Sequence, residues 1–388
     1  MKTNRIALCI GLFLLVCTAM TGQIMPPKGN VGIAANYPGD LGIENDPDVI
    51  LAEGFESYNN AGWSDLGRNW DLINQQHMSI ITDSENVISG EKALQMSLPK
   101  QNADLYVGID LYLTEEQKQD VIYIRYYHKL EDTYNIPKGV ATHNGGCISS
   151  RYWTTPNGSG PGYCANGTNK YLAMFQNVSE HYECLGIYTY HPYQRYNDIP
   201  PVWVDPGRPA TASGKQWGDY LFPNGEVMPW TYWRGNYGSD FIVRDNFTIE
   251  FGRWYCYELM LKANTPGKRD GRITAWVDGE IMADFGNMRF RDISDLKIDL
   301  VGFSLGCASN PVAAAKGWFD NIVIAKSYIG PIYDSYTNKV NDDGIAALPK
   351  ITGYYNVMGI KLPKEPASGM YIIKYDDGTA EKKIKIKN

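Results

Sequence analysis

The stretch YCYELMLKANTPGKRDGRITAWVDGEIMADF, residues 255–285, decides the fold class of this chain. Apolar and polar side chains alternate along it, which is the pattern of a strand with one buried face. One face of its first run carries four large apolar side chains: Tyr255, Tyr257, Leu259 and Leu261. A second alternating run ends at the Asp-Gly pair of residues 278 and 279, a typical two-residue hairpin sequence. The stretch predicts antiparallel framework strands and contains no group arranged to transfer a proton.

The rest of the 388-residue chain extends this pattern. Aromatic residues make up 13% of it and long helical periodicity is nearly absent, so a helical fold is excluded. Strand-like segments recur from residue 49 to about residue 332, separated by turns or by loops rich in Gly, Pro and Asn. These features predict one large all-β sandwich of antiparallel sheets. A short helix is expected at LTEEQKQD, residues 113–120, with Thr114 as its cap.

The N-terminal residues have the composition of a secretory signal peptide. Lys2 and Arg5 precede an apolar run from Ile6 to Val16, and small residues follow it, which predicts a signal peptide over 1–22 with cleavage before Gln23. No other apolar run is long enough to span a membrane, so no transmembrane segment is expected. The predicted location is secreted or cell-surface. With a formal net charge of −7 and no Lys/Arg cluster, the chain has no basic surface for a nucleic acid, and no nucleic-acid partner is expected.

Changes in composition divide the exported part of the chain into four segments. Residues 23–48 form a leader segment that is expected to lie on the domain surface, and 49–332 form the sandwich. Residues 333–350 form a linker, and 351–388 form a compact tail of short strands. Five cysteines lie outside the signal peptide. Cys147 and Cys164 flank one Gly-rich loop and are the expected disulfide, whereas Cys256 in a strand pattern is expected to be a small buried hydrophobe.

Several segments between residues 120 and 325 resemble a known family. The segments FGRWYCYELMLKANTPGKRDGRITAWVDGEIM, GFSLG and WFDNIVI resemble the back half of jelly-roll polysaccharide lyases of the alginate and glucuronan lyase type. Upstream, YYHKLEDTYNIPKG, HNGG, YLAMFQ and GIYTYH resemble the segments that carry the family's active-site side chains. The resemblance implies a concanavalin A-like β-jelly-roll sandwich of the lectin/glucanase group. It also implies an extended, acidic polysaccharide as the partner.

The tail resembles a second family. In YNVMG, GMYIIKY and KKIKIKN it is similar to the C-terminal sorting domain of type IX secretion cargo in Bacteroidetes. The resemblance implies a small C-terminal β-sandwich that the type IX secretion machinery recognises. A small immunoglobulin-like accessory module is the alternative.

The chain departs from the lyase pattern at two places. The family has a Lys in a Gly-rich turn, but residues 139–143 of this chain read GVATH. Where the family has Ser-x-Arg, this chain has Met174 and Gln176. Tyr188 and Tyr190 do match the family's Tyr-x-Tyr. Part of the expected machinery is therefore replaced.

The residues that remain can be assigned to the steps of β-elimination. Cleavage of a uronate polymer requires neutralising the carboxylate, removing the proton beside it and protonating the leaving oxygen. The candidates are Gln176 and Arg151 for the carboxylate, His143 or Tyr190 as base, and Tyr188 as acid. Tyr188 and Tyr190 are expected to share one strand face and to converge with the His143 loop in an open groove of the concave sheet. An ordinary tyrosine titrates near about 10, so a cation such as Arg151 is needed beside it. Each residue also has a simpler interpretation: a sugar-stacking platform for the tyrosines, a turn residue for His143, and a surface ion pair for Arg151.

A long irregular segment, residues 193–237, is dense in Trp, Tyr, Arg and Pro. Loops of this length inside a compact domain are usually functional. Aromatic rings stack on sugars and Arg binds carboxylates, so a wall of the binding site is expected here. The expected substrate-binding residues are Trp153, Tyr193, Arg195, Trp217 and Trp233. The alternative is a loop that packs on itself.

Phe55-Glu56 near the first strand and Phe319-Asp320-Asn321 near the last resemble the arrangement by which jelly-roll carbohydrate modules hold a structural calcium. The resemblance implies calcium as a cofactor, with Glu56 and Asp320 as ligands. Other chemistries lack their motifs: no Glu-x-Asp-x-x-Glu run, phosphate loop, zinc motif or serine nucleophile elbow is present.

Together these patterns predict a secreted polysaccharide lyase that cleaves an acidic, uronate-containing polysaccharide by β-elimination. The first alternative is a non-catalytic carbohydrate-binding protein of the same fold. The second is an adhesin-like structural protein of the cell surface.

Overall fold

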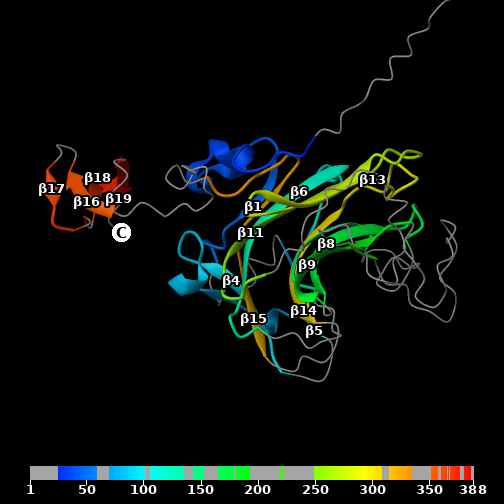
Figure 1. Cartoon of the computed structure of the whole chain (residues 1–388), viewed down its shortest axis with the longest axis horizontal. Coiled ribbons are helices and arrows are strands. Elements are labelled where there is room, and N and C mark those ends of the chain that lie inside the picture. The colour runs from blue at the N-terminus through cyan, green and yellow to red at the C-terminus, as the bar shows by residue number, and fades with distance from the viewer. Residues whose placement is uncertain are drawn as a thin grey trace, which may run out of the picture.

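A computed structural model gives the fold. It describes residues 25–58, 70–100, 105–134, 143–152, 165–178, 181–192, 219–221, 249–307, 314–333, 351–356, 360–364, 366, 368–375 and 380–385. Across these residues all the paired strands are antiparallel and form three sheets. Two large sheets make the body of the molecule, and the third belongs to the tail (Figure 1). The predicted all-β jelly-roll sandwich is confirmed.

The first large sheet has the strand order β13-β12-β11-β6-β15-β4-β3, with β1 also paired to β15. Its strands are β1 (Val49–Glu53), β3 (Met78–Ile81), β4 (Ala93–Leu98), β6 (Val121–Leu130), β11 (Tyr255–Lys262), β12 (Gly271–Val277), β13 (Glu280–Met288) and β15 (Ala315–Ala325).

The second large sheet has the order β10-β9-β8-β7-β14-β5-β2. Its strands are β2 (Asp71–Ile73), β5 (Leu105–Tyr112), β7 (Gly145–Ser150), β8 (Tyr171–Val178), β9 (His181–Tyr190), β10 (Asp219–Leu221) and β14 (Leu300–Cys307). Neighbours in both sheets are often far apart in sequence, as in β6 beside β15 and β7 beside β14. Such crossovers are typical of Greek-key sandwiches.

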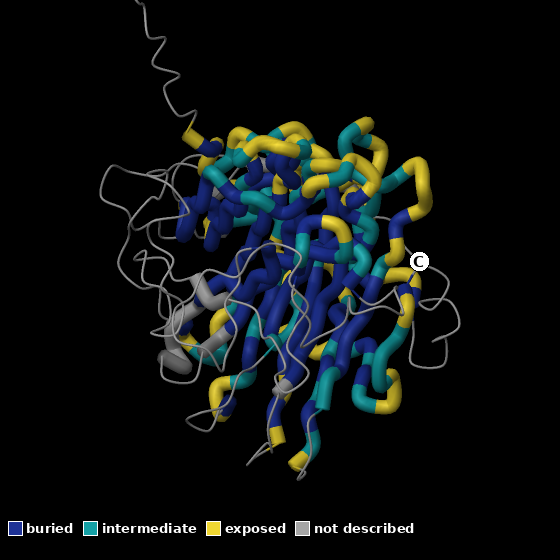
Figure 2. Tube along the Cα trace, turned by 90° about the vertical axis from the view of Figure 1, so that its right-hand side faces the viewer, coloured by how far each residue is buried: buried dark blue, intermediate teal, exposed yellow. Residues whose placement is uncertain are grey.

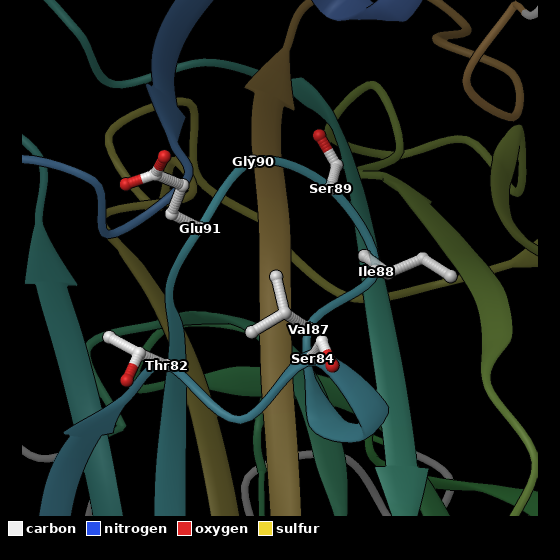
Figure 3. Close-up of a pocket in the computed structure, with 7 residues that line it drawn as sticks. All are labelled: Thr82, Ser84, Val87, Ile88, Ser89, Gly90 and Glu91. Atoms are coloured by element: carbon white, nitrogen blue, oxygen red, sulfur yellow. The ribbon is translucent and has the colours of Figure 1, made fainter. Parts of the chain in front are cut away.

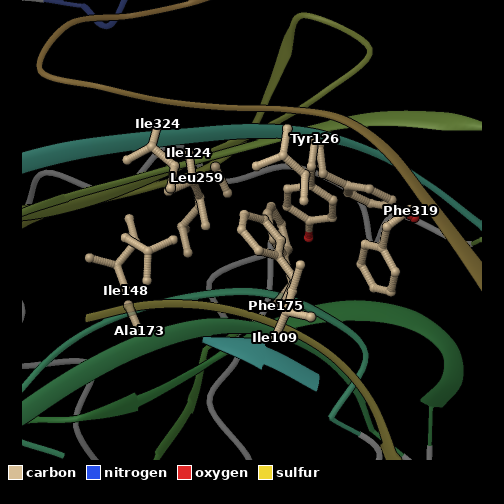
Figure 4. Close-up of a cluster of buried hydrophobic side chains, with 14 of the residues drawn as sticks. Ile109, Ile124, Tyr126, Ile148, Ala173, Phe175, Leu259, Phe319 and Ile324 are labelled. Carbon is tan, nitrogen blue, oxygen red and sulfur yellow. The ribbon is translucent and has the colours of Figure 1, made fainter. Parts of the chain in front are cut away.

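The main hydrophobic core fills the space between the two large sheets. Figure 4 shows side chains from β6, β11 and β15, including Tyr126 and Leu259, facing side chains from β5, β7 and β8, including Ile148 and Phe175. The Tyr126 hydroxyl accepts a 2.8 Å hydrogen bond from the Gly146 N–H, so this polar group is satisfied inside the core. Strand interiors are buried and exposure is concentrated at turns (Figure 2).

Residues 255–285 fold as predicted. The four apolar side chains of β11, from Tyr255 to Leu261, all lie in the main core. The turn between β12 and β13 has positive φ at both Asp278 (50°) and Gly279 (79°), the geometry of the hairpin that an Asp-Gly pair favours. Cys256 is a free, buried thiol on the opposite face of β11, as expected.

Residues 25–48, which contain the short 3-10 helices η1 (Ile33–Asn36), η2 (Pro38–Asp40) and η3 (Ile43–Asn45), pack on the outer face of the first sheet. Ile33, Ala34 and Ile43 form a buried cluster with β15 and Ile329. Asp40 forms an ion pair with the fully buried guanidinium of Arg125 on β6. We call residues 25–48 the N-terminal strap. It closes the sandwich on the side opposite the second sheet.

The strap also replaces water as partner for polar groups at the edge of the sheet. The Trp276 indole N–H donates to the Pro27 carbonyl at 2.7 Å, and the Gly29 N–H donates to the Gly279 carbonyl at 2.7 Å. On the same face, the buried Glu258 carboxylate accepts hydrogen bonds from the Ile329 and Gly330 N–H groups, both at 2.8 Å.

The tail forms a four-stranded sheet of order β17-β16-β18-β19. Its strands are β16 (Ile351–Asn356), β17 (Lys361–Leu362), β18 (Gly369–Tyr375) and β19 (Ala380–Lys385). None of the described strands of the tail pairs with a strand of the two large sheets. Within the described residues no helix is both long and apolar enough to cross a membrane.

Two sequence predictions are wrong. The helix expected at residues 113–120 is a single turn, closed by hydrogen bonds from the Gln117 and Lys118 N–H groups to the Thr114 carbonyl. The segment is too short to propagate, and Gln119 already pairs with Ile298 in a β-bridge. The disulfide between Cys147 and Cys164 is also not formed. Cys147 is a free thiol because β7 carries its side chain into a buried cluster.

Candidate functional site

The candidate site lies on the face of the second large sheet that points away from the main core, called here the outer face. Strand alternation puts Phe175 and Ile187 into the core, so Met174 on β8 and Tyr188 on β9 lie on the outer face. Cross-strand pairing continues this row through Cys147 on β7. The prediction that Tyr188 and Tyr190 share one strand face is confirmed.

Tyr188 and Tyr190 interact directly. Their hydroxyl groups are 3.1 Å apart in a hydrogen bond, and their rings meet edge to face at 5.4 Å. The His143 ring lies 6.0 Å from the Tyr188 ring, also edge to face. The segment that contains HNGG and the Tyr-x-Tyr strand are therefore brought together, as the sequence predicted.

Backbone contacts fix the position of His143. Its N–H donates to the Gly306 carbonyl at 3.0 Å, and its own carbonyl accepts a 3.0 Å hydrogen bond from the Ser304 hydroxyl. The half-buried side chain is surrounded by protein, and this desolvation lowers the pKa of the imidazole to about 4. The ring is therefore neutral at pH 7 and has a free lone pair that can accept a proton.

The two tyrosines are not exposed. Tyr188 is 4% exposed and Tyr190 is fully buried. They belong to a cluster that also contains Cys147, Tyr152, Ala165, Leu172, Met174 and Leu300. The expected open groove at these hydroxyl groups is therefore not present in the part of the chain described. A sugar can reach them only if side chains around them move.

Lys170, immediately before β8, supplies a positive charge that the sequence analysis missed. Its ammonium group lies 4.1 Å from the centroid of the Tyr190 ring and 4.9 Å from that of Tyr152, and the residue is fully buried. No local pattern marks Lys170, because a lysine just before a strand usually points into solvent.

Arg151, which was expected to be this cation, makes other contacts. It has a positive φ of 49° at the end of β7, its N–H donates to the Asp299 carboxylate at 2.9 Å, and its guanidinium donates to the Asp295 carbonyl at 3.4 Å. It thus holds the loop before β14. Gln176 is fully buried one pleat along β8 from Met174, opposite Gly186 of β9. It remains on the outer face with the tyrosines.

The outer face continues across β14 and β5, where the sequence analysis named no candidates. Cross-strand pairing extends the row from Cys147 through Gly302 to Asp110. Asp110 is 2% exposed, and burial together with the charge of Asp71 raises its pKa to about 7. No sequence motif marks this carboxyl, since its neighbours in the row come from distant parts of the chain.

Comparison with known proteins identifies the fold. No protein-family model and no curated protein matches the sequence. The alginate lyase Aly36B, in a complex with alginate trisaccharide, is similar in structure, with a TM-score of 0.50 and 16% identity over 73% of this chain and 99% of that one. An alginate lyase from Aplysia kurodai has a TM-score of 0.48 and 14% identity over 72% of this chain and 99% of that one.

A third similar structure is the endo-β-1,4-glucuronan lyase from Trichoderma reesei. Its TM-score is 0.42, with 13% identity over 72% of this chain and 96% of that one. At 16% identity, the likeness to the Aly36B complex supports the jelly-roll fold alone. It does not by itself assign an activity.

The two expected calcium ligands lie at one surface loop. Glu56 accepts hydrogen bonds from the Glu91 and Lys92 N–H groups at 2.9 and 3.1 Å. Asp320 accepts from the Ile88 and Ser89 N–H groups at 3.1 and 3.3 Å. The loop between these contacts, together with Thr82 and Ser84, lines a surface pocket (Figure 3).

These contacts do not make a metal site in the arrangement described. The carboxylates already accept N–H donors, whereas calcium takes six to eight oxygen ligands. In the described ranges no group of three or more His, Cys, Asp or Glu side chains converges as a metal site would require. Burial raises the pKa of Asp320 to about 7 despite its N–H partners, and the charge of Glu56 adds to this. Calcium stays a prediction.

The expected substrate-binding residues of the long insertion cannot be placed. Trp153, Tyr193, Arg195, Trp217 and Trp233 all lie outside the described residues. Their assignment to the wall of a binding site stays a prediction.

Proposed function

We propose that this protein is a polysaccharide lyase that cleaves a uronate-containing polysaccharide by β-elimination. The observation that carries the proposal is a neutral imidazole, His143, placed beside the hydrogen-bonded hydroxyl pair of Tyr188 and Tyr190 on one sheet face. Elimination needs a proton acceptor and a proton donor on the same segment of substrate, and this trio supplies both kinds of group.

In this proposal His143 removes the proton beside the uronate carboxylate, and the Tyr188 hydroxyl protonates the leaving glycosidic oxygen. Tyr190, the hydrogen-bond partner of Tyr188, holds that hydroxyl in position. An imidazole with a pKa of about 4 is a weak base, so most of the rate must come from stabilising the negative charge that develops on the substrate. The buried ammonium of Lys170 and the amide of Gln176 are the groups available for this role.

Replacement of Tyr188 by Phe tests the proposal. Tyr188→Phe removes the proposed acid and should lower the rate of formation of unsaturated chain ends about 100-fold or more, because a positioned acid contributes at least that factor. The measurement is ultraviolet absorbance during incubation with a panel of uronate polysaccharides.

Tyr171→Phe is the matched control. Tyr171 is a buried tyrosine of the neighbouring strand β8, but its hydroxyl donates to the Leu296 carbonyl and its ring lies in the main core. The control should lose about 1 kcal/mol of stability and keep its turnover. Equal loss of turnover in both variants would argue against a role for Tyr188.

A non-catalytic carbohydrate-binding protein is the second candidate function. The burial of both tyrosines supports it, as does the apolar pair Leu172 and Met174 on the strand beside them. Retention of the protein in affinity gels containing uronate polysaccharides, without any unsaturated ends formed, would favour this function over the lyase.

We also propose that the protein is exported and recognised by type IX secretion machinery. The apolar run of residues 6–16 and the sequence of the tail support export, and the tail sheet β16–β19 is a unit that such machinery could bind. Removing residues 351–388 should leave the protein in the periplasm of a Bacteroidetes host that secretes the full chain. Secretion of the shortened chain would contradict the proposal.

A further inference from the structure

Asp110 is a nearly buried carboxyl group on the outer face of the second sheet. It lies on β5 and is 2% exposed, and it accepts no hydrogen bond from any residue that the structure describes. Its position is defined by Gly302 on the adjacent strand, where a Cβ atom would lie 2.3 Å from the Asp110 Oδ1 atom. The carboxyl group therefore lies over β14, toward the middle of the outer face.

Keeping a carboxyl group in this state is costly to the fold. Burial removes most of the water that would solvate an ionised carboxyl group, and no described residue donates a hydrogen bond in its place. Asp71, directly opposite on β2, adds like-charge repulsion instead of relieving it. A ligand that donates hydrogen bonds to this carboxyl group would remove the cost.

Two tyrosines flank Asp110 on the same face of β5. The Tyr106 ring lies over Gly108 and Gly306, since Cβ atoms there would be 2.9 and 3.0 Å from ring carbons. Tyr112 is 41% exposed. Tyr106 is half-buried and Asp71 is exposed, so this end of the outer face is open to solvent. Aromatic rings beside a carboxylate provide a stacking surface and an acceptor for hydroxyl groups, which is what a sugar ring requires.

Asp110 and Tyr188 belong to one cross-strand row. The row runs from Tyr188 through Met174, Cys147 and Gly302 to Asp110, which is four strand spacings, or about 19 Å. A polysaccharide that crosses the strands along this row would place a different sugar unit at each end. A uronate carboxylate beside Asp110 and Asp71 would be repelled, whereas an uncharged sugar would not.

We propose that Asp110, Tyr106 and Tyr112 form a subsite for an uncharged, hydroxyl-rich sugar unit, so that the natural substrate alternates uronates with neutral sugars. This inference rests on the proposed function, because it names the class of polysaccharide on which the same sheet face acts. It also separates this protein from enzymes that act on uniform polyuronates.

Binding measurements with two sets of polymers test the inference. The first set places uncharged sugars between the uronates of one linear chain (hyaluronan, unsulfated chondroitin and gellan), and the second consists of uronates alone (polyglucuronate, polygalacturonate and alginate). Affinity electrophoresis of the full chain should show tighter binding to at least one mixed polymer than to every uniform one. Binding to none of the mixed polymers, or tighter binding to a uniform one, would overturn the inference.

Asp110→Asn keeps the shape of the side chain and removes its charge. It should weaken binding of the preferred mixed polymer about tenfold, since a charged hydrogen bond is lost, and strengthen binding of the uniform polymers. Asp295→Asn, which removes the same charge from an exposed loop, should change neither. If Asp110→Asn leaves both affinities unchanged, Asp110 does not contact the sugar and the inference fails.

Two further measurements keep the result unambiguous. Tyr112→Ala removes an exposed ring and should also weaken binding of the mixed polymer. This variant tests the subsite even if Asp110→Asn does not fold. Binding that disappears on adding a chelator would mean that the carboxylates hold a cation, and would overturn the sugar subsite. All of these assays measure binding, so a protein that prefers mixed polymers but never forms unsaturated ends would contradict the lyase and leave the subsite standing.

Discussion

His143 and His128 are both neutral histidines, but they lie on different sides of the second sheet. Burial lowers the pKa of His128 to about 3, and its ring stacks on Phe319 at 4.2 Å, next to the main core. His143 lies instead against the Tyr188 ring on the outer face. Both histidines are therefore neutral, but His128 serves to pack the core whereas His143 is the candidate base.

This pair provides a matched test of the proposed base. His143→Gln should lower turnover by about 100-fold or more, because glutamine cannot accept the proton, while the protein stays folded. His128→Gln should lower the melting temperature and keep turnover per folded molecule. Absorbance of unsaturated ends and thermal melts measure the two effects. Unchanged turnover in His143→Gln would assign the base to another group.

At the level of single residues, sequence reasoning located part of the site. Tyr188, Tyr190 and His143 were named and are close together, because a motif and a short loop position them. Lys170 and Asp110 were missed. Whether a lysine before a strand or an aspartate within one faces the site depends on which distant strand lies alongside, and a single sequence does not encode that pairing in any local pattern.

Among the elements, the N-terminal strap makes the single contact whose loss is expected to lower the stability of the fold most. Arg125 is fully buried, and its ion pair with Asp40 is the contact that compensates its charge. Asp40→Asn suits the left-handed backbone at this position, where φ is 58°, but removes the charge. We expect the free energy of unfolding to fall by about 3 kcal/mol, because a buried guanidinium is left without its carboxylate.

The controls for this prediction use the same segment and the same pair. Glu44→Gln changes an exposed acid of the strap and should alter stability by less than about 0.5 kcal/mol. Asp40→Asn combined with Arg125→Met should recover much of the loss, since no guanidinium is then buried without its carboxylate. Urea unfolding measures all three. Turnover should not change, because the strap packs on the other sheet from the tyrosines.

Local strand order was predictable and long-range order was not. The run β11–β12–β13 follows the sequence, so alternation and one Asp-Gly turn define both its faces and its register. The pairings β6–β15 and β7–β14 join segments more than 150 residues apart. The row that connects Tyr188 to Asp110 depends on such pairings, and it became visible only in three dimensions.

For the whole molecule, the balance of buried carboxyls and histidines sets how stability depends on pH. Burial raises the pKa of Asp110, Glu258 and Asp320 to about 7 each, above their values in the unfolded chain. The folded state therefore holds protons that the unfolded state has released, and stability falls as the pH rises through 7. His128 and His143 act in the opposite sense, but only between about pH 4 and 6.5.

The expected stability profile follows from these signs. Between pH 6 and 8 the free energy of unfolding should fall by about 1 kcal/mol for each of the three carboxyls. Between pH 4.5 and 6 the two histidines offset about two of the three carboxyls, so stability should fall by only about 1 kcal/mol per pH unit. Thermal melts across this range measure it. A melting temperature that rises from pH 6 to pH 8 would contradict the prediction, because it would mean that these carboxyls ionise in the folded state without loss of stability.

The fold class of the whole molecule was correctly predicted from composition and periodicity, because aromatic, turn-rich alternation has few compact solutions. The disulfide between Cys147 and Cys164 was wrongly predicted, because spacing along the chain does not reveal the direction in which a side chain points.

The docking of the N-terminal strap also determines where recombinant versions of the protein can begin. The backbones of Pro27 and Gly29 form hydrogen bonds with the first sheet. Apolar side chains of β15 are covered by Ile33, Ala34 and Ile43. A version that starts at residue 49 would leave that patch in water and invite self-association. Expression boundaries should therefore keep residue 25, and an affinity tag joined there needs a flexible spacer to clear the edge of the sandwich.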